Sequence, residues 1–252
     1  MRPLRLYRVS AIVLRSRDLG EADRLLTLFS PERGKLAAVA KGARRPRSKL
    51  AAGLQLFTHS DLQLAVGANL DIVTQVVIRH AFYPLRQDLT RLAYASYFVE
   101  LTDRLTEERS PQRRLFALLR HTLLHLENGL APVSLARGFE LRAMSLLGYE
   151  PELLSCVSCR RAIAPGPTGF SPALGGVICP RCRAQHSGLI PLSADSRGAM
   201  QQLLGLTVAA APRLELPLRA QAELERTLRL YLEYRLDHRL NSLRFLGQFA
   251  VS

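Results

Sequence analysis

Residues 25–40 read LLTLFSPERGKLAAVA, and this stretch decides the fold of the N-terminal part of the chain. Two apolar runs, Leu25–Phe29 and Leu36–Ala40, flank the segment Ser30–Gly34, whose proline and glycine are typical turn residues. Short apolar runs on both sides of such a turn predict two paired β-strands. The neighbouring strands can be placed outward from this hairpin.

Three more strand-like segments lie on either side of the hairpin. Val9–Leu14 is a β-rich run before it, and the alternating segment Leu54–Val66 and the apolar segment Asp71–Ile78 follow it. Five strands without a long helix between them predict a small barrel, and a five-stranded OB-type barrel fits the count. The stretch Ala43–Gly53 is too short for much of the helix that many OB folds carry at this place.

After Pro84 the pattern of apolar residues becomes helical. Apolar side chains recur at three- and four-residue steps over Tyr94–Leu105, Leu115–Leu126 and Leu135–Leu147, and at every fourth residue over Leu224–Leu240. Such stripes are typical of helices that bury one face. The second part of the chain is therefore expected to form an α-helical bundle.

Four cysteines form two pairs, CVSC at 156–159 and CPRC at 179–182, with nineteen residues between them. Two residues between cysteines allow both thiolates to face one ion, and two such pairs complete a tetrahedral site. Residues 169–178 read as two short strands around a turn, so a zinc ribbon is predicted. Its ligands to one structural Zn²⁺ would be Cys156, Cys159, Cys179 and Cys182. Four free thiols are one alternative. A redox-active pair is another, but the sequence shows no thioredoxin-like context for it.

The charge of the chain is strongly positive and unevenly distributed. The formal net charge is +14, and residues 33–49 contain seven basic and no acidic side chains. Such a block favours an acidic partner, and nucleic acid suits it better than a membrane because no large apolar face accompanies it. A solvated loop without a partner is the alternative. The predicted DNA-binding residues are Arg33, Lys35, Lys41, Arg44, Arg45, Arg47 and Lys49.

The sequence carries no recognisable catalytic motif. There is no phosphate-binding GxxxxGK loop and no HExxH, and no acidic residue completes a site with His121 and His125. The protein is therefore not expected to be an enzyme. No apolar run is long enough to span a membrane, and the N-terminus lacks a secretory signal, so we expect a cytoplasmic protein.

Several segments together resemble one known family. Residues 20–25 read GEADRL, residues 34–45 read GKLAAVAKGARR, and residues 54–57 read LQLF. Further on, LLGYEP at 146–151 and GGVIC at 175–179 accompany the cysteines. In this order the segments resemble the RecO family of bacterial recombination mediators.

The resemblance implies an α+β, multidomain fold. An N-terminal OB-fold β-barrel would occupy residues 1–81, and an α-helical bundle residues 82–151 and 188–252. An inserted four-cysteine zinc ribbon would occupy residues 152–187. The family binds single- and double-stranded DNA and anneals complementary strands. Together with RecR it helps RecA to replace the single-strand DNA-binding protein (SSB), whose acidic C-terminal tail it contacts.

That tail ends in apolar residues, so it requires an apolar pocket with cations around it. Arginines lie beside the leucine stripes of the helical region, and we expect the pocket there: Arg120, Arg137, Arg226, Arg229, Arg235 and Arg239. The alternative is that these arginines only keep the bundle soluble. A different reading of the whole chain is an RNA-binding or ribosome-associated protein, because a barrel with a zinc ribbon also suits translation.

Overall fold

The computed structural model describes residues 5–129, 132–207 and 210–236, together with Leu240, Ser242 and Leu246. The chain divides into two compact units, one within residues 1–127 and 242–252 and the other within residues 128–241. Each unit is described by itself. Within the described residues, no helix combines the length and the apolarity needed to span a bilayer.

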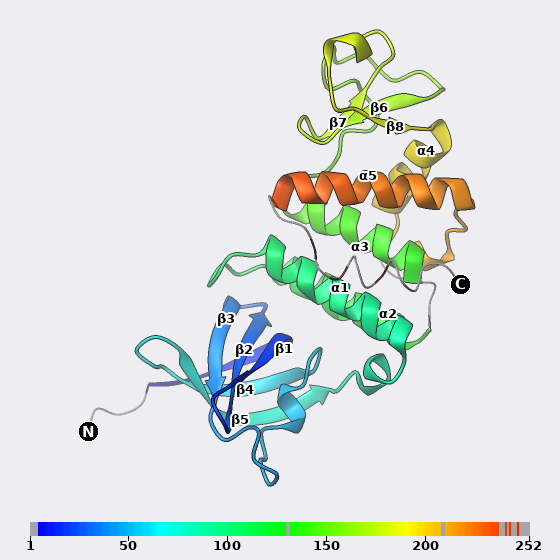
Figure 1. The fold of residues 1–252 in the computed structure, drawn as a ribbon. Coiled ribbons are helices and arrows are strands. Elements are labelled where there is room, and N and C mark those ends of the chain that lie inside the picture. Colours follow the sequence, from blue (N-terminus) through cyan, green and yellow to red (C-terminus); the bar gives the residue numbers. More distant parts are fainter. Residues whose placement is uncertain are drawn as a thin grey trace. The chain divides into compact units, whose positions relative to one another are not determined.

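The first unit is built on a closed five-stranded barrel (Figure 1). Its strands pair in the order β1-β2-β3-β5-β4 and back to β1, antiparallel except for β3 and β5. The parallel closure is short, with Ala38 opposite Asp71 and Val39 opposite Ile72. The predicted OB-like barrel is confirmed. The strands are β1 (Leu6–Leu19), β2 (Asp23–Ser30), β3 (Gly34–Ala40), β4 (His59–Ala65) and β5 (Asp71–His80).

Alternate side chains of β3 and β4 are buried inside the barrel. Along β3, Leu36, Ala38 and Ala40 are buried, and they pack with fully buried residues such as Leu26 and Leu64. Period-two alternation therefore produces the core, as the hairpin sequence predicts. Each buried leucine contributes about 1.5–3 kcal/mol relative to an exposed one.

The fourth strand begins later than the sequence indicates. The alternation from Leu54 onward predicts strand, but β4 starts at His59. Ala52–Leu54 is instead one turn of 3-10 helix, and Phe57 takes a left-handed backbone conformation (φ 72°) that reverses the chain. Leu54 and Phe57 are nevertheless fully buried. The apolar pattern of this segment reflects burial, not strand geometry.

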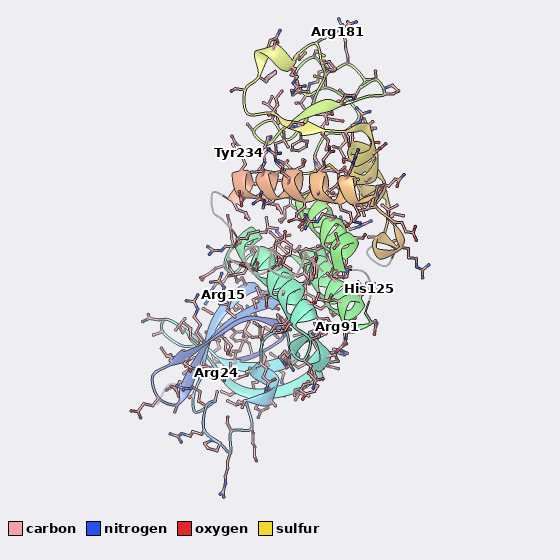
Figure 2. The ribbon with its side chains drawn as sticks, turned by 45° about the vertical axis from the view of Figure 1, so that its right-hand side comes forward. Arg15, Arg24, Arg91, His125, Arg181 and Tyr234 are labelled. Carbon is pink, nitrogen blue, oxygen red and sulfur yellow. The ribbon has the colours of Figure 1, made fainter. Side chains whose placement is uncertain are left out.

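Two helices, α1 (Leu89–Leu105) and α2 (Arg113–Glu127), pack on the barrel (Figure 1). Asp88 caps α1 by accepting a hydrogen bond from the Arg91 amide at 2.7 Å. On α1 the buried Asp103 forms salt bridges with Arg15 of β1 and Lys35 of β3 (Figure 2 labels Arg15). The predicted stripe on α2 is buried throughout.

The connector between α1 and α2 continues the barrel sheet. The Arg109 amide donates to the Lys35 carbonyl at 2.9 Å, and Glu108 forms a parallel bridge with Lys35. The Ser110 backbone lies so close to Gly34 that a Cβ there would stand 2.2 Å from the Ser110 carbonyl oxygen. The connector thereby pairs with the part of β3 that β5 does not reach.

In its described residues, the second unit contains three α-helices and a small three-stranded sheet. Leu224, Leu228 and Leu232 are buried along the last helix, as the four-residue spacing predicts. The helices are α3 (Pro132–Leu146), α4 (Ala194–Gly205) and α5 (Leu218–Leu236). The sheet, in the order β7-β6-β8, consists of β6 (Thr168–Ser171), β7 (Gly176–Ile178) and β8 (Ile190–Leu192). Besides η1 at Ala52–Leu54, short 3-10 turns occur at η2 (Tyr83–Arg86), η3 (Arg183–Gln185) and η4 (Ala211–Arg213).

Candidate metal centre and nucleic-acid interface

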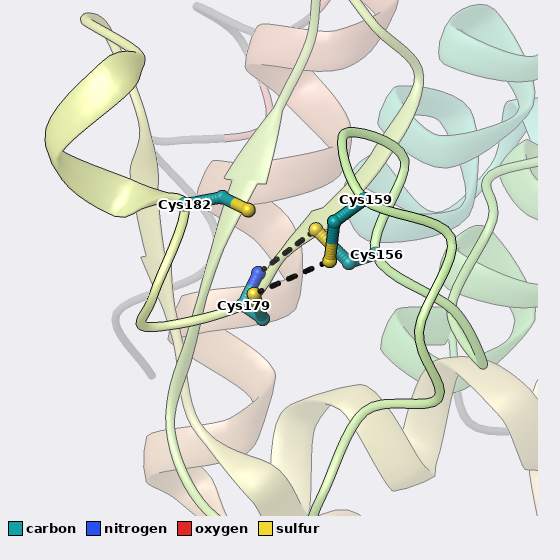
Figure 3. A group of neighbouring side chains, drawn as sticks. All are labelled: Cys156, Cys159, Cys179 and Cys182. Carbon is teal, nitrogen blue, oxygen red and sulfur yellow. Dashed lines mark hydrogen bonds between the residues drawn. The ribbon is translucent and has the colours of Figure 1, made fainter.

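The four cysteine sulfurs converge on one point in the second unit (Figure 3). Cys156 and Cys159 lie before β6, while Cys179 and Cys182 follow β7, so the β6–β7 hairpin brings the two pairs together. All four Sγ atoms lie within 4.8 Å of one another, and those of Cys159 and Cys179 are 3.9 Å apart. Four thiolates around Zn²⁺ at about 2.3 Å stand about 3.8 Å from each other. The cluster therefore fits a tetrahedral metal ion such as zinc.

The backbone around Cys156 favours the thiolate form of this residue. The Cys179 amide donates to the Cys156 Sγ at 3.3 Å. Burial alone raises the pKa of the Cys156 thiol, but amides of Cys179, Cys159 and Ser158 outweigh it and lower the pKa to about 6. An anionic sulfur is the form that binds a metal ion.

The histidine and the arginines near the cluster do not join the four cysteines. His186 hydrogen-bonds the Ser158 hydroxyl at 3.0 Å instead of joining them. Arg181 projects from the ribbon (Figure 2), and the neighbouring arginines are exposed as well. Arg160 has a positive φ of 62°, a conformation in which glycine is the usual residue.

The basic residues of the 33–49 stretch lie at two ends of β3. Lys41–Lys49 form a loop after β3, beside the turn between β1 and β2, whereas Arg33 lies in the turn before β3. Seven strand residues span about 20 Å, so the two groups are well separated. The structure brings together five of the seven predicted residues: Lys41, Arg44, Arg45, Arg47 and Lys49.

We call this loop the rim loop (residues 41–49). Hydrogen bonds and an ion pair hold it to the turn between β1 and β2 and the adjoining strand ends, and its cationic side chains are exposed. The Gly42 amide donates to Asp23, and the Arg44 guanidinium bonds the Gly20 carbonyl and pairs with Asp18. Among the described residues, no acidic side chain pairs with the other four cations. Those four are Lys41, Arg45, Arg47 and Lys49, all exposed.

Lys35 occupies a different environment. Its side chain is only 16% exposed, and its ammonium pairs with Asp103 at 3.2 Å and donates to the Asp103 carbonyl at 2.7 Å. Arg33, by contrast, is exposed, and its guanidinium lies 5.1 Å from the centre of the Tyr7 ring. Lys35 thus holds α1 on the barrel, and Arg33 remains open to a ligand.

Aromatic side chains are nearly absent from the surface of the barrel. Phe29 and Phe57 are fully buried, and Tyr7 is half-buried. The rim loop itself contains no aromatic residue. The rim loop therefore offers charged side chains and no aromatic ring to a ligand.

Arginines of the helical regions differ from one another in exposure. Arg226 and Arg229 are exposed on α5, whereas Arg137 is buried and pairs with Glu140 at 3.0 Å. Arg137 therefore cannot stand at the mouth of a surface pocket. Arg235 lies among the rings of Tyr149, Tyr231 and Tyr234. Half-buried Arg120 contacts His121, and Arg239 lies outside the described residues.

One pocket of the first unit was not anticipated. It has a volume of about 640 Å³ and carries the side chains of Arg5, Arg33 and Arg109. Arg5 and Arg109 are far from the 33–49 stretch in the sequence, so a search for local charge blocks does not find them. Only the pairing of the 108–109 segment with β3 places Arg109 there.

Comparison with known proteins identifies both parts of the chain. The model for the N-terminal part of recombination protein O matches residues 1–82, and that for its C-terminal part matches residues 86–244. A DNA repair protein RecO from Symbiobacterium thermophilum is 42% identical over 245 residues, which cover 96% of each chain. Its counterpart from Pelotomaculum thermopropionicum is 40% identical over 247 residues, covering 98% of this chain and 96% of its own. Because the family models and these relatives cover nearly the whole sequence, the chain belongs to the RecO family of DNA repair and recombination proteins.

Proposed function

We propose that this protein is a recombination mediator that binds single- and double-stranded DNA through the rim loop and anneals complementary strands. With RecR it would help to load RecA onto SSB-coated DNA in the cytoplasm, acting by binding and not by catalysis. One observation carries the proposal: five exposed cations lie on nine residues at one end of an OB-like barrel, and within the described part of the chain only Arg44 among them has an acidic partner.

The chemistry of annealing follows from this charge. Two DNA strands repel each other through their phosphates, and cations held at one place reduce that repulsion. Because the rim loop has no aromatic side chain, it leaves the bases free to pair with a second strand. We therefore expect little dependence on base sequence and a strong dependence on salt.

The four-cysteine cluster supports this activity as a structural element. Four thiolates leave no open position on the metal for water or substrate, so one Zn²⁺ per chain would stabilise the ribbon without taking part in binding. The ribbon has little core of its own, mainly Cys156, Ile178 and Cys182. The bound metal would replace the missing apolar burial.

The protein partners are proposed from the family resemblance together with the surface charge. The exposed Arg226 and Arg229 lie on α5, which also exposes the apolar side chains of Leu218 and Tyr234, and cations near exposed apolar groups suit an acidic tail that ends in apolar residues. We assign the SSB tail to this helix and DNA to the rim loop. The matched families are named for recombination and repair, which favours this reading over a role in translation.

The salt dependence of DNA binding tests the rim loop. Five phosphate contacts on duplex DNA give a slope of log affinity against log salt of about −4.5. The double variant Arg45→Glu, Arg47→Glu should bind all DNA sequences more weakly and flatten the slope by about two units. Fluorescence anisotropy at several salt concentrations measures both quantities, and a strand-annealing assay follows the activity.

A matched control separates the loop from overall charge. Arg113 and Arg114 are exposed at the start of α2, and their reversal to glutamate changes the net charge equally. If this control weakens binding as much as the loop variant does, the rim loop is not the DNA site. Preference for RNA over DNA of the same sequence would instead support the translational alternative.

A further inference from the structure

The pocket of about 640 Å³ lies beside the short closure between β3 and β5. Three separate segments supply its cations: Arg5 precedes β1, Arg33 lies in the β2–β3 turn, and Arg109 in the α1–α2 connector. Tyr7 and Asp71 also belong to its wall. Cations that converge from three places distant in the sequence form a concave site and not a linear basic run.

We propose that this pocket binds a nucleoside phosphate, namely the phosphorylated terminal nucleotide of a single DNA strand. The proposal rests on the DNA-binding function argued above and assigns the strand end to a place apart from the rim loop.

The charges of the pocket suit a terminal phosphate. Arg5 and Arg33 are exposed, and no described acidic side chain forms an ion pair with either of them. Arg109 is 73% exposed and stands 3.9 Å from the Asp71 carboxylate. A terminal phosphate carries nearly two negative charges at neutral pH, whereas a phosphate within a strand carries one. Three cations therefore favour the terminal phosphate of a strand over a phosphate within it.

The wall of the pocket suits a base as well. The Arg33 guanidinium lies 5.1 Å from the centre of the Tyr7 ring, and a planar cation in this position offers its other face for stacking. The Tyr7 hydroxyl donates to Asp71, and burial together with this carboxylate raises the pKa of Tyr7 far above its usual range. Glu32 adds a second carboxylate, which can accept a hydrogen bond from the amino group of a base.

The size of the pocket and the backbone of Arg109 support the same ligand. A volume of about 640 Å³ lies within the range of small-ligand sites and accommodates one nucleotide, not a duplex. Arg109 has a positive φ of 58°, which is unfavourable for a residue with a side chain. The hydrogen bond that its amide donates to the Lys35 carbonyl holds this conformation, and its side chain lines the pocket. Backbone strain of this kind is concentrated at ligand sites.

The test compares three forms of one internally labelled single strand, bound to the full chain. One form has hydroxyl ends, one a 5′-phosphate and one a 3′-phosphate. We expect one of the phosphorylated forms to bind about tenfold more tightly than the hydroxyl form. Equal affinity for all three forms, with adenosine monophosphate unable to bind, would overturn the proposal. Binding of adenosine monophosphate without a preference for phosphorylated ends would uphold the nucleoside-phosphate chemistry and identify a free nucleotide as its source.

The variants assign the preference to the pocket. Arg109→Gly removes the cation and suits the positive φ, so the fold should be retained, and Arg33→Gln removes a second cation. Both should reduce the tenfold preference to about twofold or less. The control Arg47→Gln in the rim loop should weaken all three forms alike and leave the ratio unchanged. The assignment is contradicted if the preference for a phosphorylated end survives in both pocket variants. It is also contradicted if an acidic peptide abolishes this preference and adenosine monophosphate does not. If the rim loop is not a DNA site, the Arg47→Gln variant will bind the strand with hydroxyl ends as tightly as the wild type does. That result is distinct from a loss of the preference for phosphorylated ends.

Discussion

Lys35 and Lys41 show how position decides the role of a cation. Both belong to the same basic stretch, but Lys35 pairs with the buried Asp103, while Lys41 is exposed on the rim loop. Sequence alone does not distinguish them, because the partner of Lys35 lies sixty-eight residues away. The structure separates a cation that stabilises the fold from one that is free to meet phosphate.

The substitution Lys35→Gln should therefore lower stability more than DNA binding. It removes a charged hydrogen bond and leaves Asp103 with Arg15 alone, a loss of about 2 kcal/mol in the free energy of unfolding. Urea denaturation measures this loss, while the salt slope for DNA should change little. Lys41→Gln should show the reverse, and a Lys35→Gln protein with full stability but a flatter slope would refute this division of roles.

His59 should make the stability of the first unit depend on pH. Burial lowers the pKa of His59, and the neighbouring Arg120 lowers it further. The unfolded chain takes up a proton near pH 6.5, whereas the folded chain does so only at lower pH, so stability falls as the pH drops below about 6.5. Urea denaturation of wild type and His59→Gln between about pH 7.5 and 5.5 should show a shallower fall in the variant. Parallel curves would mean that another group is responsible. Asp61 is not that group, since its hydrogen bond to Arg79 lowers its pKa and keeps its titration below this pH range.

At the scale of elements, the β2–β3 turn and the α1–α2 connector depend on each other. Gly34 ends the turn with a φ of 67° and lies against the Ser110 backbone. The absence of a side chain at Gly34 thus serves both the backbone conformation and the close approach of the connector. The same glycine is a turn signal in the sequence, but only the first of its two functions can be read there.

Two glycine substitutions separate these contributions. Gly20→Ala should cost about 1–2 kcal/mol, since Gly20 has a φ of 59° but nothing within 4 Å of a Cβ atom. Gly34→Ala combines the same backbone cost with a clash at 2.2 Å, so its total should exceed about 3 kcal/mol. Thermal or urea denaturation gives both values. Equal losses at the two positions would show that the connector moves away at no cost.

Patterns within short stretches of sequence predict the elements that form from neighbouring residues. The hairpin at residues 25–40 and the cysteine pairs follow from alternation, turn residues and spacing, and the structure confirms both. Leu54 was misassigned to a strand because an apolar residue can be buried in a 3-10 turn as well. The placement of Arg109 at the pocket could not be predicted, since it depends on the pairing of Glu108 with Lys35, 73 positions earlier in the chain.

At the scale of the whole molecule, the two compact units should respond differently to loss of metal. The cysteine cluster belongs entirely to the unit within residues 128–241. Removal of the ion by a chelator should reduce amide protection at the β6–β7 pairs by at least about 100-fold, equivalent to about 3 kcal/mol. The β2–β3 amides of the barrel should keep their protection.

Hydrogen exchange followed by mass spectrometry measures this response peptide by peptide. Addition of Zn²⁺ should restore the protection, and Cys156→Ser should reproduce the chelated state even with metal present. Uniform loss of protection in both units, or a ribbon that is unaffected by chelation, would show that the metal does not act as a local structural element.

The pairing of the connector with β3 also decides whether the barrel can be separated from the rest of the chain. The N-terminal family model ends at residue 82, yet Asp103 and the 108–109 segment complete the charge pairs and the strand edge of the barrel. A gene fragment cut at that boundary would encode a barrel with two unmatched cations and an open edge, which invites pairing with other chains. The barrel is consequently not an exchangeable module. Transfer of the barrel to another protein would therefore have to include α1 and the connector, which supply these contacts.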